Sequence, residues 1–101
     1  MIITGGENVY STEVEQVVTQ HPAVFEAAII GTPHPVWGET VTAVVALKQG
    51  YTLTIEELRE FCRDKLADYK IPRILKIVDL LPRNASGKIL KYRLRGEIKN
   101  S

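Results

Sequence analysis

The segment LPRNASGKILK, residues 81–91, places a lysine directly behind a loop of small residues. This is half of a phosphate-binding loop, and it would offer Lys88 to an anion. A complete nucleotide-hydrolysing loop needs a glycine five positions before Gly87 and a Ser or Thr after the lysine, where this chain has Pro82 and Ile89. The sequence excludes that site and leaves a solvated lysine near a helix start, or a lysine whose charge is met by an anion. The partial positive charge of a helix N-terminus disfavours the first interpretation.

Other residues that could do chemistry form no site by their spacing. His21 and His34 are far apart and each adjoins a proline, so we interpret both as turn residues rather than metal ligands. Cys62 falls on the apolar side of a predicted helix and is expected in the core. Ser86 has no base near it in the sequence, so no nucleophilic triad is assembled. We therefore expect no metal site in this chain.

The elements that must position these residues begin with a strand and a helix. Ile2 and Ile3 predict a short strand, and the stretch 5–8, GGEN, predicts a turn. Thr12 and Glu15 have capping-box spacing, which predicts a helix start, and a valine stripe at helical spacing follows.

Two apolar, β-branched stretches come next, at residues 24–30 and 41–47. Continuous runs of this kind are typical of strands that are buried on both faces. The stretch 31–38 between them contains two prolines and two glycines, so we expect it to have no regular structure.

The remaining chain adds helices and one more strand. Thr54 and Glu57 form a second capping box before an apolar helix stripe, and residues 74–78 predict a strand. Residues 82–87 are expected to form a loop and residues 92–98 a short basic helix. This order predicts a small α+β domain, with a mostly three-stranded sheet, helices packed on it and a short N-terminal strand or hairpin.

Length and composition agree with one globular domain. The 101 residues are 45% hydrophobic, which favours a packed core over disorder. Thirteen basic and twelve acidic side chains give a net charge of +1, so nothing indicates nucleic acid or a membrane surface as a partner. The single cysteine indicates a reducing compartment, and we expect a cytoplasmic protein without a transmembrane segment.

Four motifs stand in order along the whole chain: GGENVYSTEVE (5–15), HPAVFEAAIIGTPHPVWGE (21–39), YKIPR (69–73) and LPRNASGKILK (81–91). Together they resemble the C-terminal domain of the adenylate-forming enzymes, and most of all the fatty-acyl and aryl-acyl CoA synthetases. The resemblance implies that residues 1–101 are a single domain, the mobile lid of a larger ligase. The N-terminal domain, which binds ATP and the carboxylate, is expected to lie outside this sequence.

The resemblance also implies a mechanism in two half-reactions. A carboxylate attacks the α-phosphate of ATP, with Mg²⁺ held mainly by the other domain, and gives an acyl-adenylate and pyrophosphate. The lid then rotates, and the thiol of CoA takes the acyl group and releases AMP. Lys88 matches the adenylation lysine of the family, so the resemblance assigns it to the first half-reaction as the catalytic cation.

For the second half-reaction, the resemblance implies cofactor-binding positions at Gly5, Gly6, Trp37, Tyr69, Lys70 and Arg73. In the family, the position of Gly6 lines the channel of the pantetheine arm. The two aromatic positions pack around the CoA adenine, and the position of Arg73 contacts a CoA phosphate. From the residues alone, a plain turn at the glycine pair and a core anchor at Trp37 stay open. Glu13 and Glu15 are expected to be capping and surface residues.

Other functions stay open as well. The same lid could belong to an adenylation domain that loads a carrier protein, but contacts to the CoA adenine would then be unnecessary. Trp37, Tyr69 and Arg73 favour free CoA. A luciferase-like oxidising relative and a non-enzymatic α+β binding module are further alternatives. We expect the isolated chain to have no ligase activity, because half of each active site would be missing.

Overall fold

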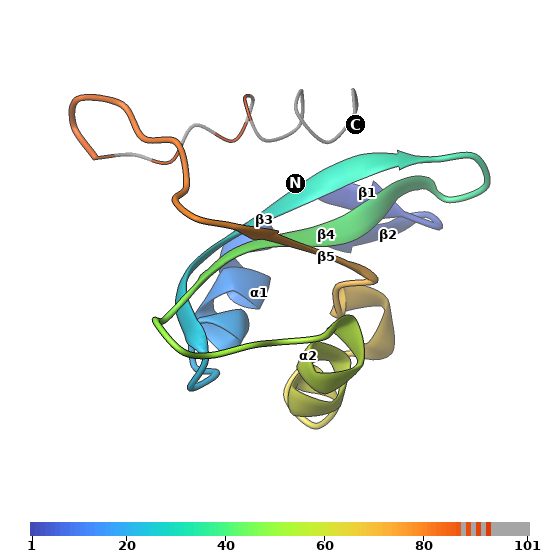
Figure 1. Ribbon diagram of the computed structural model, residues 1–101. Helices are drawn as coiled ribbons and strands as arrows, with labels where there is room; N and C mark the ends of the chain where they lie inside the picture. The colour runs from blue at the N-terminus through green and yellow to red at the C-terminus, as the bar shows by residue number, and fades with distance from the viewer. Residues whose placement is uncertain (88, 90, 92, 94–101) are drawn as a thin grey trace.

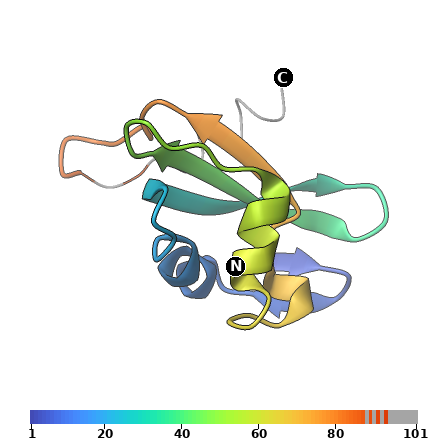
Figure 2. The ribbon, with the colours of Figure 1, turned by 60° about the horizontal axis from the view of Figure 1, so that its bottom comes forward.

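The computed structural model describes residues 1–87, 89, 91 and 93, which form a sheet and the helices that cover one of its faces (Figures 1 and 2). In chain order the elements are β1 (Ile2–Thr4), β2 (Glu7–Val9), α1 (Ser11–Val18), β3 (Val24–His34), β4 (Gly38–Leu47), α2 (Ile55–Cys62), the 3-10 helix η1 (Asp68–Lys70) and β5 (Ile74–Val78). The predicted α+β class is confirmed.

β4 is the centre of the sheet. It pairs along its whole length with antiparallel β3 and, on its other edge, with parallel β5. The β1–β2 hairpin joins this second edge where Thr4 pairs with Gly38. The expected three-stranded sheet therefore corresponds to β3, β4 and β5, and the expected N-terminal hairpin extends it to five strands.

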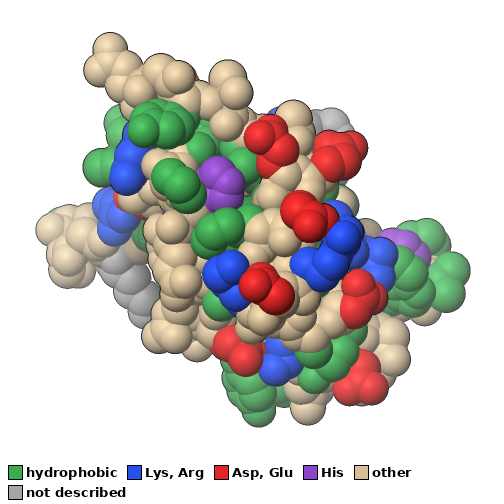
Figure 3. Space-filling model, turned by 90° about the horizontal axis from the view of Figure 1, so that it is seen from below, with side chains coloured by type: hydrophobic (Ala, Val, Ile, Leu, Met, Phe, Trp, Pro, Cys, Tyr) green, Lys and Arg blue, Asp and Glu red, His purple; other side chains and the backbone are tan. Residues whose placement is uncertain are grey.

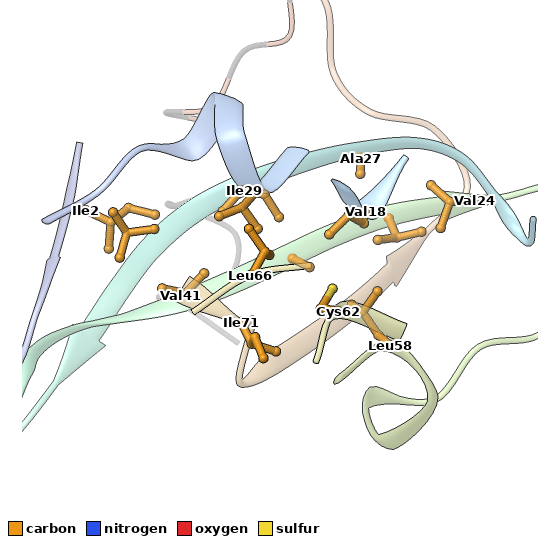
Figure 4. Close-up of a cluster of buried hydrophobic side chains, with 14 of the residues drawn as sticks. Ile2, Val18, Val24, Ala27, Ile29, Val41, Leu58, Cys62, Leu66 and Ile71 are labelled. Carbon is orange, nitrogen blue, oxygen red and sulfur yellow. The ribbon is translucent and has the colours of Figure 1, made fainter. Parts of the chain in front are cut away.

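The main core lies between the sheet and the two α-helices (Figure 4). Val14 and Val18 of α1 and Leu58 and Cys62 of α2 are all 0% exposed. Each pair is spaced four residues apart, which places both members on one helix face. Burial raises the pKa of the Cys62 thiol. The cysteine is thus a neutral core residue, as predicted.

The opposite face of the sheet is buried too. Ala28, Ile30 and Val44 pack with Leu81, which follows β5. The apolar runs of β3 and β4 therefore meet a core on both sides, which confirms that they are strands buried on both faces.

The expectation of irregular structure at residues 31–38 is wrong for most of that stretch. β3 continues to His34 and β4 starts at Gly38, so only residues 35–37 form the turn. Pro33 is tolerated because β3 is an edge strand, where a residue without an N–H interrupts no second ladder.

The two predicted capping boxes have different outcomes. The Thr54 side chain accepts the N–H of Glu57, and the Glu57 side chain accepts the N–H of Thr54, so the second box is confirmed. The first box is wrong, because the N-cap of α1 is Tyr10 and no side chain caps it. Glu15 instead accepts the N–H of Ile29 at 2.8 Å and ties α1 to β3.

The strand predicted at residues 74–78 is β5, and residues 82–87 form a loop with a single bridging residue, as expected. The helix predicted at residues 92–98 lies outside the described residues. No helix in the described part of the chain is long and apolar enough to cross a membrane. On the helix-covered side of the domain, basic and acidic side chains are interspersed (Figure 3).

Candidate functional site

A pocket opens where four segments of the chain meet, beside the junction of β1 and β4. Its volume is about 240 Å³, and it is lined by Thr4, Gly5, Glu7, Trp37, Tyr69 and Arg73. These residues come from the β1–β2 hairpin, the β3–β4 turn, η1 and the residue before β5. The strand register brings the first two segments together, because Thr4 pairs with Gly38, the neighbour of Trp37.

The glycine pair forms the tight turn of the β1–β2 hairpin. Gly5 has φ +57° and Gly6 has φ +82°, and a two-residue type I′ turn requires positive φ at both positions. The N–H of Gly5 donates to the carbonyl oxygen of Trp37 at 2.9 Å. No heavy atom lies within 4 Å of the position that a Cβ of Gly6 would take. Gly5 thus lines the pocket, and Gly6 faces open space next to it.

Trp37 is held by the imidazole of His34. The two rings stack with their centroids 4.1 Å apart and their planes 7° apart. Nδ1 of His34 accepts the N–H of Val36 at 3.1 Å and the N–H of Trp37 at 3.0 Å. The imidazole therefore both closes the β3–β4 turn and supports the indole. The interpretation of His34 as a turn residue missed this contact, although three-residue spacing across a turn was a signal for it.

Arg73 is the basic group of the pocket. Its Cζ lies 4.6 Å from the centroid of the Trp37 ring, which is a cation–π distance. Its backbone N–H donates to the carbonyl oxygen of Val41 at 2.9 Å and fixes its place before β5. Nη2 lies 3.7 Å from the Asp68 carboxylate, which is longer than a hydrogen bond. The guanidinium is therefore able to donate to an anionic ligand.

Lys70 has a different environment. Its Nζ lies 2.9 and 3.1 Å from the two carboxylate oxygens of Glu13 on α1. The hydrogen bond with Glu13 raises the pKa of Lys70. Nζ lies 5.7 Å from the centroid of the Tyr69 ring, but Lys70 does not line the pocket. Glu13 is thus an ion-pair partner that fastens η1 to α1, rather than a plain surface residue.

The walls of the pocket combine two aromatic residues and the guanidinium of Arg73 with one acidic residue, Glu7. Aromatic rings, a guanidinium and closely approachable backbone favour a flat aromatic group that carries a phosphate. A complete small-molecule site occupies about 300–1,000 Å³. The pocket of about 240 Å³ is smaller than that range, so it has room for only part of such a ligand. In the described part of the chain, no group of three or more His, Cys, Asp or Glu side chains is placed to hold a metal ion.

The loop that leads to Lys88 lies elsewhere on the domain. Figures 1 and 2 both place residues 79–87 at the end of the sheet opposite the β3–β4 turn. Oδ1 of Asn84 accepts the N–H of Ser86 at 3.0 Å, and the N–H of Gly87 donates to the carbonyl oxygen of Asn84 at 3.0 Å. A tight turn, with Gly87 at φ +85°, therefore precedes the lysine. Lys88 itself lies outside the described residues.

Among the predicted cofactor-binding residues, those that line this pocket are Gly5, Trp37, Tyr69 and Arg73. Gly6 and Lys70 adjoin these residues without lining it, and the CoA-binding roles of all six residues stay predictions. Sequence reasoning missed two further lining residues, Thr4 and Glu7. The hairpin register was the signal for them, because a two-residue turn at the glycine pair makes Thr4 and Glu7 cross-strand neighbours.

Comparison with known proteins points to one family. The model of the AMP-binding enzyme C-terminal domain matches residues 13–88. A 2-succinylbenzoate–CoA ligase from Geobacillus sp. (strain WCH70) is 48% identical over 101 residues, which are 100% of this chain and 20% of that protein.

Solved structures agree. The Mycobacterium tuberculosis fatty acyl CoA synthetase matches 99% of this chain with a TM-score of 0.91 and 42% identity, over 20% of its own chain. The amide bond synthetase McbA from Marinactinospora thermotolerans matches 95% of this chain with a TM-score of 0.89 and 41% identity, over 19% of its own chain. The chain thus spans about a fifth of the length of the relatives it matches.

Proposed function

This chain belongs to the AMP-binding enzyme C-terminal domain family, and from that premise we propose that it is the lid of an ATP-dependent, AMP-forming acyl-CoA synthetase. Residues 1–101 would form one domain of that enzyme and would work against an N-terminal domain that binds ATP, Mg²⁺ and a carboxylic acid. Its relatives include a 2-succinylbenzoate–CoA ligase and a fatty acyl CoA synthetase. We propose a fatty or aryl carboxylic acid as its substrate, and the names of these relatives support that choice.

One observation carries the proposal, the pocket that Gly5, Trp37, Tyr69 and Arg73 line together. Motif resemblance alone assigned these positions to CoA, and they lie in three separate motifs. A plain turn, a core anchor and two unrelated surface residues would have no reason to share one cavity. Stacking on the aromatic rings and hydrogen bonds from the guanidinium suit the adenine and a phosphate of CoA.

In the first half-reaction, a carboxylate oxygen of the acid forms a bond to the α-phosphorus of ATP, and pyrophosphate leaves with the electron pair of the broken bond. Negative charge builds on the phosphoryl oxygens, and Lys88 would stabilise it as a compact cation on a long stem. At about 4 Å and an effective dielectric constant near 20, two unit charges attract by roughly 4 kcal/mol before desolvation. Mg²⁺ would neutralise the phosphates from the N-terminal domain.

In the second half-reaction, the thiol of CoA loses its proton, its sulfur bonds to the acyl carbon and AMP leaves. Trp37, Tyr69 and Arg73 would hold the adenine end of CoA. The pantetheine arm would pass the glycine pair, where the open space beside Gly6 leaves room for it. Lys70 would contribute to CoA binding only on leaving its ion pair with Glu13. The β3–β4 turn, which carries Trp37 of the pocket, and the loop before the lysine lie at opposite ends of the sheet (Figures 1 and 2), so the proposal requires the domain to rotate between the two steps.

Two other acceptors compete with free CoA. A pantetheine arm on a carrier protein would leave the aromatic and guanidinium groups of the pocket without a ligand. The amide bond synthetase among the solved relatives makes an amine the third acceptor to test.

The test uses the full-length enzyme and a panel of fatty and aryl acids. The proposal predicts acid-dependent exchange of pyrophosphate into ATP and AMP release that needs CoA. Pantetheine, which lacks the adenine and the phosphates, should support AMP release only at a much higher concentration. An equal concentration dependence for CoA and pantetheine would mean that the pocket does not bind the adenine end of CoA. If AMP release were faster with a carrier protein or an amine than with CoA, that molecule would be the acceptor. If no acid supported the exchange of pyrophosphate into ATP, the ligase assignment would be overturned.

A further inference from the structure

One charged side chain holds the chain just before Lys88. The guanidinium of Arg83 contacts the Glu26 carboxylate on β3 and donates to the carbonyl oxygen of Gly87 at 2.6 Å. Glu26 also accepts the backbone N–H of Leu81 at 3.3 Å. A single carboxylate on the sheet therefore fixes the start of the loop and, through Arg83, the last residue before the lysine.

A second charged side chain holds the chain just after it. Nζ of Lys91 lies 2.7 Å from Oε2 of Glu15 and 3.0 Å from Oγ of Ser11, both on α1. The same oxygen of Glu15 accepts the N–H of Ile29 at 2.8 Å. Lys91 is therefore fastened, through Glu15, to both α1 and β3, which explains why this carboxylate serves no helix cap.

In both ion pairs the carboxylate is more buried than its basic partner. The carboxylates of Glu26 and Glu15 are only 15% and 20% exposed, whereas their partners Arg83 and Lys91 are 42% and 29% exposed. Ion pairs with a partner this exposed contribute little to the free energy of unfolding. The two ion pairs instead restrict where the chain around Lys88 lies. Each joins a carboxylate on a strand or helix to a residue that precedes or follows Lys88 in the chain.

We propose that the Glu26–Arg83 and Glu15–Lys91 pairs form a two-point clamp that sets where Lys88 is presented to the α-phosphate. The inference rests on the proposed function of Lys88, and all four clamp residues are positioning residues. The chain neighbours of the lysine are both tied to Arg83, since Gly87 accepts its hydrogen bond and residue 89 forms a β-bridge with it. A misplacement of about 1 Å can lower a rate about 100-fold, so the clamp acts on the rate of the first half-reaction.

The test breaks each pair in the full-length enzyme. Arg83→Ala and Lys91→Met should each lower the rate of acyl-adenylate formation at saturating ATP by about tenfold or more. The KM for ATP and the rate of thioester formation from supplied acyl-adenylate should stay near those of the parent. Lys91→Arg keeps the charge and the reach to Glu15, and should restore most of the rate. Arg83→Lys keeps one of two contacts, and should restore part of it.

Matched controls separate positioning from folding. Arg63→Ala removes an exposed ion pair to Glu60 on α2, where Nη1 lies 2.7 Å from the carboxylate, and should change neither half-reaction. The clamp is overturned if Arg83→Ala and Lys91→Met match Arg63→Ala, or if they slow both half-reactions equally. Lys88→Ala is measured in parallel. If it slows adenylation and the clamp variants do not, only the clamp fails; if it does not, the proposed role of the lysine fails as well.

Discussion

The pocket around Trp37 and the loop before Lys88 are held in place by different kinds of contact. Backbone hydrogen bonds and stacked rings fix the walls of the pocket, as in the bond of 2.9 Å from Gly5 to Trp37. Charged side chains fix the loop, through Arg83 and Lys91.

The difference has a physical consequence. The backbone bond from Gly5 to Trp37 joins two turns whose flanking strands β1 and β4 pair with each other, so it opens together with that part of the sheet. Exposed ion pairs are screened by salt and separate at a cost of about 1 kcal/mol or less. We call the pocket the preformed side, because the fold itself sets its walls, and the loop the adjustable side, because its position depends on two side-chain ion pairs. This division suits a domain that presents a lysine in one step and a CoA-binding face in the next.

The largest expected effect concerns the adjustable side, the loop that leads to Lys88. Lys88→Ala in the full-length enzyme should slow acyl-adenylate formation by about 10²–10³-fold, as expected when one donor to a transition state is lost. Pyrophosphate exchange measures the effect. Lys48→Ala, which removes an exposed lysine that follows β4 and lies outside the loop, is the control and should leave the exchange unchanged.

The next effect concerns the preformed side. Gly6→Leu should slow thioester formation by about tenfold or more, because the side chain would enter the proposed path of the pantetheine arm and the residue would have to keep φ near +82°. CoA-dependent AMP release from supplied acyl-adenylate is the measurement.

Gly50→Leu is the matched control for backbone strain. Gly50 has φ +83° and open space around its Cβ position, but it lies in the turn before α2. Both variants should lower the free energy of unfolding by a similar amount, about 1–3 kcal/mol. If both variants lost thioester formation equally, the glycine pair would have only a structural role as a turn.

A smaller effect sharpens the role of the guanidinium. Arg73→Ala should raise the KM for CoA about tenfold or more, because a hydrogen bond to a charged group contributes about 1.5–3 kcal/mol. The KM for pantetheine, which has no phosphate, should not change. Steady-state AMP release with the two thiols measures both. A parallel rise for both thiols would mean that Arg73 only supports the pocket wall.

The smallest effect tests how the preformed side is braced. A Cβ at Gly31 would lie 2.3 Å from Oε2 of Glu39, whose Oε1 accepts the N–H of Ile3 at 3.0 Å. Gly31→Ala should therefore displace this carboxylate and lower the free energy of unfolding by about 1 kcal/mol. Chemical denaturation of the 101-residue chain measures it. Glu39→Gln keeps the acceptor oxygen and should unfold like the parent; if Gly31→Ala does so too, the brace is unimportant.

Local patterns in the sequence predicted most of the fold. Apolar runs located β3, β4 and β5, and the Thr54 capping box located α2, because these signals depend on neighbouring residues. The errors arose where tertiary contacts override local preference. Pro33 stays in β3 because that strand lies at the edge of the sheet. Glu15 leaves its capping role because Ile29 and Lys91 compete for its carboxylate.

Four lining residues of the candidate pocket were predicted from the sequence, whereas Thr4, Glu7 and the geometry of the pocket were not. Motif resemblance selected Trp37, Tyr69 and Arg73, and only the three-dimensional structure shows that they line one pocket. The stacking of His34 on Trp37 and the pairing of Lys70 with an acidic residue of α1 depend on rotamers and distances that spacing does not encode.

The most direct test of the two-face account measures both half-reactions in one single-turnover experiment on full-length Lys88→Ala and Arg73→Ala enzymes. Rapid quenching follows acyl-adenylate formation from ATP and acid, and then thioester formation from supplied acyl-adenylate at limiting CoA. The account predicts a crossed result: Lys88→Ala slows only the first step, and Arg73→Ala slows only the second. A result in which both variants slow the same step, or each slows both steps to the same degree, would contradict it.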